Sequence, residues 1–90
     1  MQRIERSFTI VNSLGLHARP AAMLVQTANR FESEVQLEKD GIQVNAKSIM
    51  GVLTLAASKG SSLVLICEGP DAAQAMEALA KVIDSGFGER

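Results

Sequence analysis

The residues that could do chemistry lie together in one short segment, Gly15-Leu16-His17-Ala18-Arg19-Pro20-Ala21-Ala22, which holds the only histidine of the chain. A neutral imidazole is a nucleophile and titrates near physiological pH, so it can accept a phosphoryl group. Arg19 adds a planar set of donors that suits phosphate oxygens. On spacing alone, however, a capping or surface histidine without a chemical role explains this pair more readily.

A helix is predicted to begin at about His17 to Arg19. From Pro20 onward the apolar residues recur at the period of one helical face, and proline suits the first helical turn, where its missing N–H costs nothing. A helix N-terminus leaves backbone N–H groups without partners and favours an anion. If His17 accepts a phosphate, the N–H groups of Ala18 and Arg19 are expected to lie beneath it. The apolar face consists of Ala21, Leu24, Val25, Ala28 and Phe31.

Three segments show the alternation of half-buried strands. Residues 4–10 alternate between apolar and polar side chains, except that Arg6 falls on the apolar face. Residues 34–38 and 42–44 alternate as well. The pair Asp40-Gly41 between them tolerates positive φ, so a β-hairpin is predicted there.

The remaining elements follow from apolar runs and their boundary residues. Ser48 is predicted to cap a short helix over residues 49–53. The continuous apolar run of residues 63–67 indicates a strand at the centre of the sheet, covered on both faces or nearly so. A last helix is predicted to start near Asp71 and to stop at Gly86.

The order of these elements is βαββαβα. Interleaved hairpin and helices predict an α/β (α+β) fold, a two-layer open-faced sandwich in which a four-stranded antiparallel sheet carries three helices on one face. The pattern does not determine the strand order. A ferredoxin-like plait would produce the same alternation, and a small-molecule sensor on that fold therefore stays open as an alternative.

Composition excludes several classes of protein. Nine Lys and Arg stand against ten Asp and Glu, with three Phe and no Trp or Tyr, whereas a nucleic-acid-binding protein is expected to show a basic excess and aromatic stacking platforms. No apolar stretch approaches the ~20 residues of a membrane span, and the N-terminus lacks the apolar core of a signal peptide. The lone Cys67 is interpreted as a small buried hydrophobe in a reducing compartment. We expect a cytoplasmic protein that binds neither nucleic acid nor membrane.

Two motifs carry a resemblance to a known family. Residues 15–21, Gly-Leu-His-Ala-Arg-Pro-Ala, are similar to the active-site motif of HPr, the histidine-containing phosphocarrier of the bacterial phosphotransferase system. Residues 45–53, Asn-Ala-Lys-Ser-Ile-Met-Gly-Val-Leu, resemble the regulatory-serine region of the same family. The separation of the motifs and the order of elements also fit. The resemblance implies a single HPr domain over residues 1–90.

The first motif implies a role for each of its polar groups. His17 would carry the phosphoryl group, on Nδ1 in this family, while Arg19 and the backbone at Ala18 would steady the phosphate. The donor would be Enzyme I, charged by phosphoenolpyruvate, and the acceptors would be EIIA domains, with no metal or cofactor on the carrier. Such a protein is a recycled substrate of enzymes and not an autonomous catalyst. A monomer is expected, because a transient carrier keeps its docking face free.

The second motif implies regulation and docking. Ser48 would be phosphorylated by an ATP-dependent HPr kinase/phosphorylase, which adds about −1.5 to −2 charge at a helix N-terminus. Its effect is expected at partner surfaces more than in stability. Ile49, Met50 and Leu53 cannot all face one side of a short helix, so an exposed apolar patch is expected for partners to bind, with Lys47 at its rim.

Some features depart from the family members of sugar systems. Leu14 stands where a small polar residue often lies near the histidine ring. Residues 85–90 resemble the nitrogen-related branch, whereas the region of Ser48 resembles the Gram-positive type and its paralogue Crh, which lacks the histidine. The pathway branch, sugar uptake or nitrogen-related regulation, therefore stays open. An alternative function is a binding module that acts mainly through phosphorylated Ser48.

Overall fold

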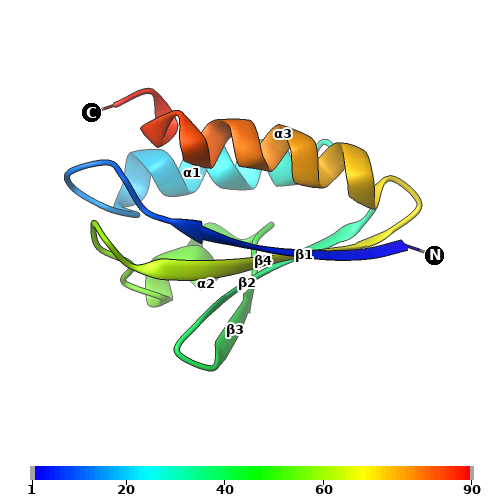
Figure 1. Cartoon of the computed structure of the whole chain (residues 1–90), viewed down its shortest axis with the longest axis horizontal. Helices are drawn as coiled ribbons and strands as arrows, with labels where there is room; N and C mark the ends of the chain where they lie inside the picture. Colours follow the sequence, from blue (N-terminus) through cyan, green and yellow to red (C-terminus); the bar gives the residue numbers. More distant parts are fainter. Residues whose placement is uncertain (1, 90) are drawn as a thin grey trace.

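A computed structural model describes residues 2–89 of the chain. The elements follow the predicted order βαββαβα, with one additional short helix at the end (Figure 1). Their bounds are β1 (Gln2–Thr9), α1 (Ala18–Ala28), β2 (Glu34–Lys39), β3 (Ile42–Asn45), α2 (Ile49–Thr54), β4 (Ser62–Gly69), α3 (Ala72–Asp84) and the 3₁₀ helix η1 (Gly86–Gly88).

The four strands form one antiparallel sheet in the order β1-β4-β2-β3. The predicted open-faced sandwich is therefore confirmed. In a ferredoxin-like plait the first and third strands are central, whereas here β1 and β3 form the two edges. The plait is ruled out by this strand order, and with it the sensor hypothesis that required that fold.

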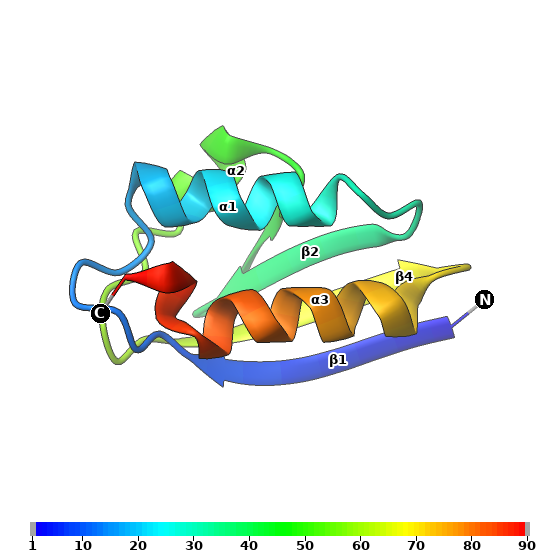
Figure 2. The same cartoon turned by 90° about the horizontal axis from the view of Figure 1, so that it is seen from above.

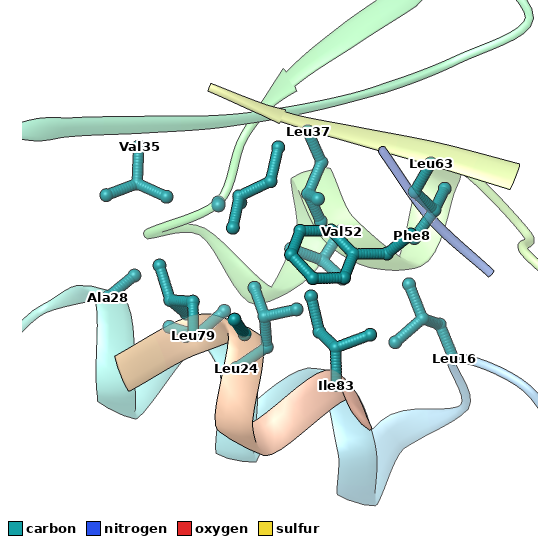
Figure 3. Close-up of a cluster of buried hydrophobic side chains, with 14 of the residues drawn as sticks. Phe8, Leu16, Leu24, Ala28, Val35, Leu37, Val52, Leu63, Leu79 and Ile83 are labelled. Atoms are coloured by element: carbon teal, nitrogen blue, oxygen red, sulfur yellow. The ribbon is translucent and has the colours of Figure 1, made fainter. Parts of the chain in front are cut away.

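The helices α1 and α3 lie side by side over one face of the sheet, and α2 lies beside α1 (Figures 1 and 2). Their apolar faces meet the sheet in one core, in which Leu24 of α1 and Leu79 of α3 are fully buried. The short helix α2 contributes Val52 to the same core. The labelled core residues of Figure 3 are Phe8, Leu16, Leu24, Ala28, Val35, Leu37, Val52, Leu63, Leu79 and Ile83.

The central strand β4 explains the apolar run at residues 63–67. Leu63, Leu65 and Cys67 point into the core and are completely buried. On the opposite face no helix of residues 2–89 covers the strand, so the expectation of cover on both faces holds only in part. Ile66 is 6% exposed there because neighbouring polar side chains, among them Arg3 and Glu34, stand around it.

The alternation of apolar and polar residues in β1 is broken by Arg6, which the strand tolerates because β1 lies at the edge of the sheet. Arg6 sits in register with apolar neighbours, yet its side chain is exposed and its guanidinium lies 4.9 Å from the ring centroid of Phe8. Ile10, which the alternation placed in the strand, follows it and is 1% exposed. Its backbone continues the pairing, since Ile10 N donates to Ser61 O at 2.9 Å.

Local predictions at the turns and at the cysteine are confirmed. Asp40 and Gly41 join β2 to β3 with φ of 52° and 81°, the positive values that a two-residue hairpin turn of type I′ requires. Cys67 is free and buried, and burial raises the pKa of its thiol to about 11. The thiol is therefore neutral at physiological pH and packs as a small apolar group.

Within residues 2–89, none of the helices combines the length and the apolar character needed to cross a membrane.

Candidate functional site

His17 is the N-cap residue of α1. Its backbone is extended, with φ −79° and ψ −171°, and its carbonyl accepts the first helical bond from Ala21 N at 3.0 Å. The backbone N–H groups of the first turn have no acceptor within the helix. Because Pro20 has no N–H, those of Ala18 and Arg19 are the free donors at the very start of α1. No acidic residue lies in this first turn. The predicted helix start is confirmed, and its positive end lies directly beside the histidine.

Gly15 holds the loop before His17 against the segment that follows α2. Its φ is +68°, and a Cβ placed on it would lie 2.4 Å from the carbonyl oxygen of Ala57. The next residue, Leu16, donates its N–H to that oxygen at 2.8 Å and is 4% exposed. Only a glycine permits this backbone conformation together with such a close approach. The position of His17 thus depends on a contact between two loops.

The ring of His17 contacts the end of the chain. Its Nε2 lies 2.8 Å from Oε1 of Glu89, and the side chain of His17 is 37% exposed. Asn12 connects both partners, because its Nδ2 donates to the same Oε1 at 3.0 Å and to the carbonyl of Gly15 at 2.8 Å. Asn12 is completely buried. These contacts bring residues from the two ends of the chain to one place.

Glu89 reaches the ring because the chain turns sharply after α3. Gly86, Phe87 and Gly88 all have positive φ, and Phe87, at 2% exposure, anchors the turn in the core. Figure 2 shows this C-terminal turn beside the loop that precedes α1. The hydrogen bond from His17 is the main cause that lowers the pKa of the Glu89 carboxyl, with further contributions from Asn12 and from the charge of Arg19. Burial opposes this shift.

Arg19 lies on the exposed side of the first turn of α1. Its positive charge is close enough to the C-terminal turn to help lower the pKa of Glu89. The structure thus places His17, Arg19 and the N–H groups at the start of α1 at one end of this helix. It adds Asn12 and Glu89, which sequence reasoning missed.

No local signal identifies Glu89, which is 72 positions away from His17. An asparagine three residues before a glycine also suits an ordinary turn, so Asn12 carried no distinct signal.

Ser48 is the N-cap residue of α2, as predicted. Its backbone is extended, and its Oγ accepts a hydrogen bond from Gly51 N at 3.2 Å. The side chain is half-buried.

Ser48→Ala is expected to lower the free energy of unfolding by about 1 kcal/mol, within the range of about 0.5–2 kcal/mol for lost N-caps, because Gly51 N loses its acceptor. Chemical denaturation of the purified variant measures this difference. Ser13→Ala, at an exposed loop position, is the matched control and should leave the stability unchanged. A Ser48→Ala variant as stable as the wild type would show that the cap contributes nothing.

The four residues predicted for docking fall into two groups. Ile49 and Met50 are 43% and 73% exposed and form an apolar patch on α2. Leu53 is partly buried and packs against the core. Lys47 is half-buried, and its Nζ donates to the carbonyl of Phe31 at 2.7 Å. The expectation that the apolar residues divide between core and surface is confirmed. In the loop before His17, Leu14 is 73% exposed, so it adds a further apolar side chain beside the site.

Comparison with known proteins agrees with this architecture. The family model described as "PTS HPr component phosphorylation site" matches residues 4–85. The phosphocarrier protein HPr of Cupriavidus necator is 51% identical over 96% of this chain and 97% of its own length. The HPr-like protein Crh of Halalkalibacterium halodurans is 53% identical over 90% of this chain and 96% of its own. The crystal structure of HPr-C-His from Thermoanaerobacter tengcongensis superposes with a TM-score of 0.93 at 49% identity, covering 97% of this chain and 98% of that one.

The fold is a small open-faced sandwich of the type seen in HPr structures, and in this chain His17 lies at the N-terminus of a helix. The chain belongs to the HPr family, the phosphocarriers of the phosphotransferase system. Members of this family work with Enzyme I and EIIA proteins and are not catalysts themselves.

Proposed function

We propose that His17 accepts a phosphoryl group from phosphorylated Enzyme I, ultimately from phosphoenolpyruvate, and passes it to an EIIA protein. The observation that carries the proposal is the position of His17 at the N-cap of α1, in a chain matched by the family's phosphorylation-site model. The N–H groups of Ala18 and Arg19 and the guanidinium of Arg19 bind the phosphate. No metal is required on the carrier.

The strength of these contacts suits a carrier. An exposed charge–dipole contact contributes ~0.3–1 kcal/mol, and a hydrogen bond from a charged group such as Arg19 adds ~1.5–3 kcal/mol. Together they hold a phosphohistidine without trapping it. The protein is thereby a recycled substrate of Enzyme I and of its acceptors.

The direct test is phosphorylation in solution. The purified protein is incubated with phosphoenolpyruvate, Mg²⁺ and Enzyme I of the same organism, and its intact mass is measured. We expect one phosphoryl group that is lost in acid, as a phosphoramidate is, and none when Enzyme I is omitted. An unmodified protein beside a control HPr that the same Enzyme I phosphorylates would contradict the proposal.

We further propose that Ser48 is a regulatory phosphorylation site for an HPr kinase/phosphorylase. The support is its place at the N-terminus of α2, directly before the exposed Ile49 and Met50. A phosphate there retains an oxygen for Gly51 N and places about two negative charges next to the apolar patch. Phosphorylation is therefore expected to weaken docking by repulsion and to leave the fold intact. The alternative function, a binding module that acts mainly through phosphorylated Ser48, uses the same surface.

The apolar patch of Ile49 and Met50 is proposed as a docking surface, with Leu53 and Lys47 at its border. Met50→Glu is expected to raise the KM for phosphoryl transfer from Enzyme I at least about five-fold, which corresponds to ~1 kcal/mol of a buried apolar contact. The melting temperature should not change, because Met50 is 73% exposed. Steady-state transfer assays and thermal melts measure both quantities.

The matched control is Ile42→Glu. Ile42 is an apolar residue beside the hairpin turn, and its side chain is 61% exposed. This variant should transfer phosphate like the wild type. An equal effect of both substitutions would show that general surface charge, and not docking at α2, determines KM.

The cellular setting follows from the same proposal. We propose a cytoplasmic monomer of one HPr domain, because a carrier must present its docking face to its partners in turn. A related HPr from Thermoanaerobacter tengcongensis forms a dimer in its crystal, so light scattering of this protein at assay concentration is the deciding measurement. The identity of the EIIA acceptor separates sugar uptake from nitrogen-related regulation.

A further inference from the structure

The carboxylate of Glu89 is hydrogen-bonded to Nε2 of His17, and the HPr family is phosphorylated on the other ring nitrogen, Nδ1. We propose that Glu89 is a positioning residue: it holds the proton of His17 on Nε2, leaves the lone pair on Nδ1 for phosphorus, and stabilises the positive charge that the ring gains during transfer. This inference rests on the proposed function of His17 as the phosphoryl acceptor.

The hydrogen-bond pattern around Oε1 determines where the proton lies. Oε1 of Glu89 is 2.8 Å from His17 Nε2 and 3.0 Å from Asn12 Nδ2. The pKa of this carboxyl is lowered, mainly by the bond from His17, so the group is ionised at neutral pH and can only accept. Nε2 must therefore carry the hydrogen. A neutral imidazole protonated on Nε2 has its lone pair on Nδ1.

Asn12 holds the carboxylate in place. Its Nδ2 faces two acceptors, Gly15 O at 2.8 Å and Glu89 Oε1 at 3.0 Å, and an amide turned the other way would set its oxygen against both. The orientation of the buried amide is thus determined by its partners. Through Asn12 the carboxylate is tied to the backbone two residues before His17. The side chain of Glu89 is only 24% exposed, which protects the bond from competing water.

The transfer step balances without moving a proton. The lone pair of Nδ1 forms a bond to phosphorus, while the bond between phosphorus and Enzyme I breaks and its electron pair stays on the donor. The ring becomes an N-phosphorylated imidazolium, with its original hydrogen still on Nε2 and its positive charge facing Oε1 of Glu89. On transfer to the acceptor, the P–N bond breaks and its electrons return to Nδ1. A carboxylate that orients a histidine and balances its charge in this way acts on the ring and does not touch the phosphorus.

The sequence offers a direct spectroscopic test, because His17 is the only histidine. In ¹⁵N-labelled protein at a pH where the ring is neutral, long-range ¹H–¹⁵N spectra report both ring nitrogens of this one residue. In the wild type we expect Nε2 in the protonated range and Nδ1 in the unprotonated range. Glu89→Ala should move the two shifts toward each other, because a ring without a fixed partner exchanges between its tautomers.

Glu89→Gln separates orientation from charge. Its carbonyl oxygen can still accept from Asn12 Nδ2 and His17 Nε2, so the tautomer should stay as in the wild type, while the negative charge is lost. Glu77→Gln, an exposed substitution on α3, removes the same charge elsewhere and should change nothing. Thermal melts of all variants show whether a difference comes from unfolding.

The kinetic arm measures phosphoryl transfer from phosphorylated Enzyme I in a single turnover. Glu89→Ala is expected to slow transfer within the complex about 10- to 100-fold, by analogy with the loss seen when the carboxylate partner of a metal-binding histidine is removed. Glu89→Gln should lie between Glu89→Ala and the wild type, with KM nearly unchanged in both.

Three results would overturn the proposal: averaged ring shifts in the wild type, unchanged shifts in Glu89→Ala, or changed shifts without loss of rate. A wild type that accepts no phosphate would instead contradict the function of His17, and the spectra would still show whether Glu89 holds the ring.

Discussion

His17→Ala is expected to fold like the wild type and to accept no phosphoryl group from phosphorylated Enzyme I. The side chain is 37% exposed and its ring hydrogen-bonds Glu89 near the end of the chain, so its loss leaves no cavity in the core. Because the chain has no second histidine, no other imidazole replaces it. Intact-mass spectrometry after incubation with phosphoenolpyruvate, Mg²⁺ and Enzyme I measures the result, and circular dichroism during heating confirms the fold.

The same variant separates the two functions considered for the chain. A carrier loses all activity with His17, whereas a regulatory module that acts through phosphorylated Ser48 retains binding to its partner. The control is the wild type treated in parallel with the same Enzyme I. An acid-labile phosphate on His17→Ala would place the acceptor at another residue and remove the proposed function.

Gly15→Ala is expected to destabilise the protein by about 2–4 kcal/mol, which combines the strain of positive φ in a non-glycine residue with overpacking against a backbone. The φ of Gly15 is +68°, and the new methyl group would lie 2.4 Å from the Ala57 oxygen and 2.8 Å from the Cα of Ser58. Both contacts are backbone atoms, which cannot rotate away as a side chain can. The melting temperature should fall by at least about 10 °C.

Gly60→Ala is the matched control for this prediction. Its φ is also positive, at +89°, but nothing lies within 4 Å of the added methyl group. It should cost only about 1 kcal/mol, the strain of the conformation alone. If both variants lose the same stability, the contact between Gly15 and Ala57 does not constrain the loop. A folded Gly15→Ala protein should also transfer phosphate more slowly, because the loop that holds His17 must shift.

The features that sequence reasoning predicted correctly are set by close neighbours in the chain. Pro20 and the apolar period after it determine where α1 begins, and therefore that His17 is its N-cap residue. The conformational freedom of Asp40 and Gly41 determines the hairpin, and the hydroxyl of Ser48 reaches Gly51, three residues further on. Each of these outcomes depends on energies that act within a few residues.

Other features depend on how the elements pack. The antiparallel order β1-β4-β2-β3 was not contained in the alternation of elements, which a ferredoxin-like plait shares. The apolar run of β4 indicated a central strand, but Ile66 is shielded by polar neighbours and not by a second layer. An apolar residue in the sequence predicts that water will be excluded from its side chain, but it does not predict which groups will exclude the water.

In the candidate site, too, some features are set by adjacent residues and others by the packing of distant segments. By itself the sequence determined the candidate residue His17, the helix that begins at it and the family to which the motif belongs, because these follow from adjacent residues. Only the tertiary structure placed Asn12 and Glu89 around the ring. A hydrogen bond across 72 positions exists only after the sheet, α3 and the turn at Phe87 have brought both ends of the chain together, and no pattern of neighbouring residues encodes that meeting.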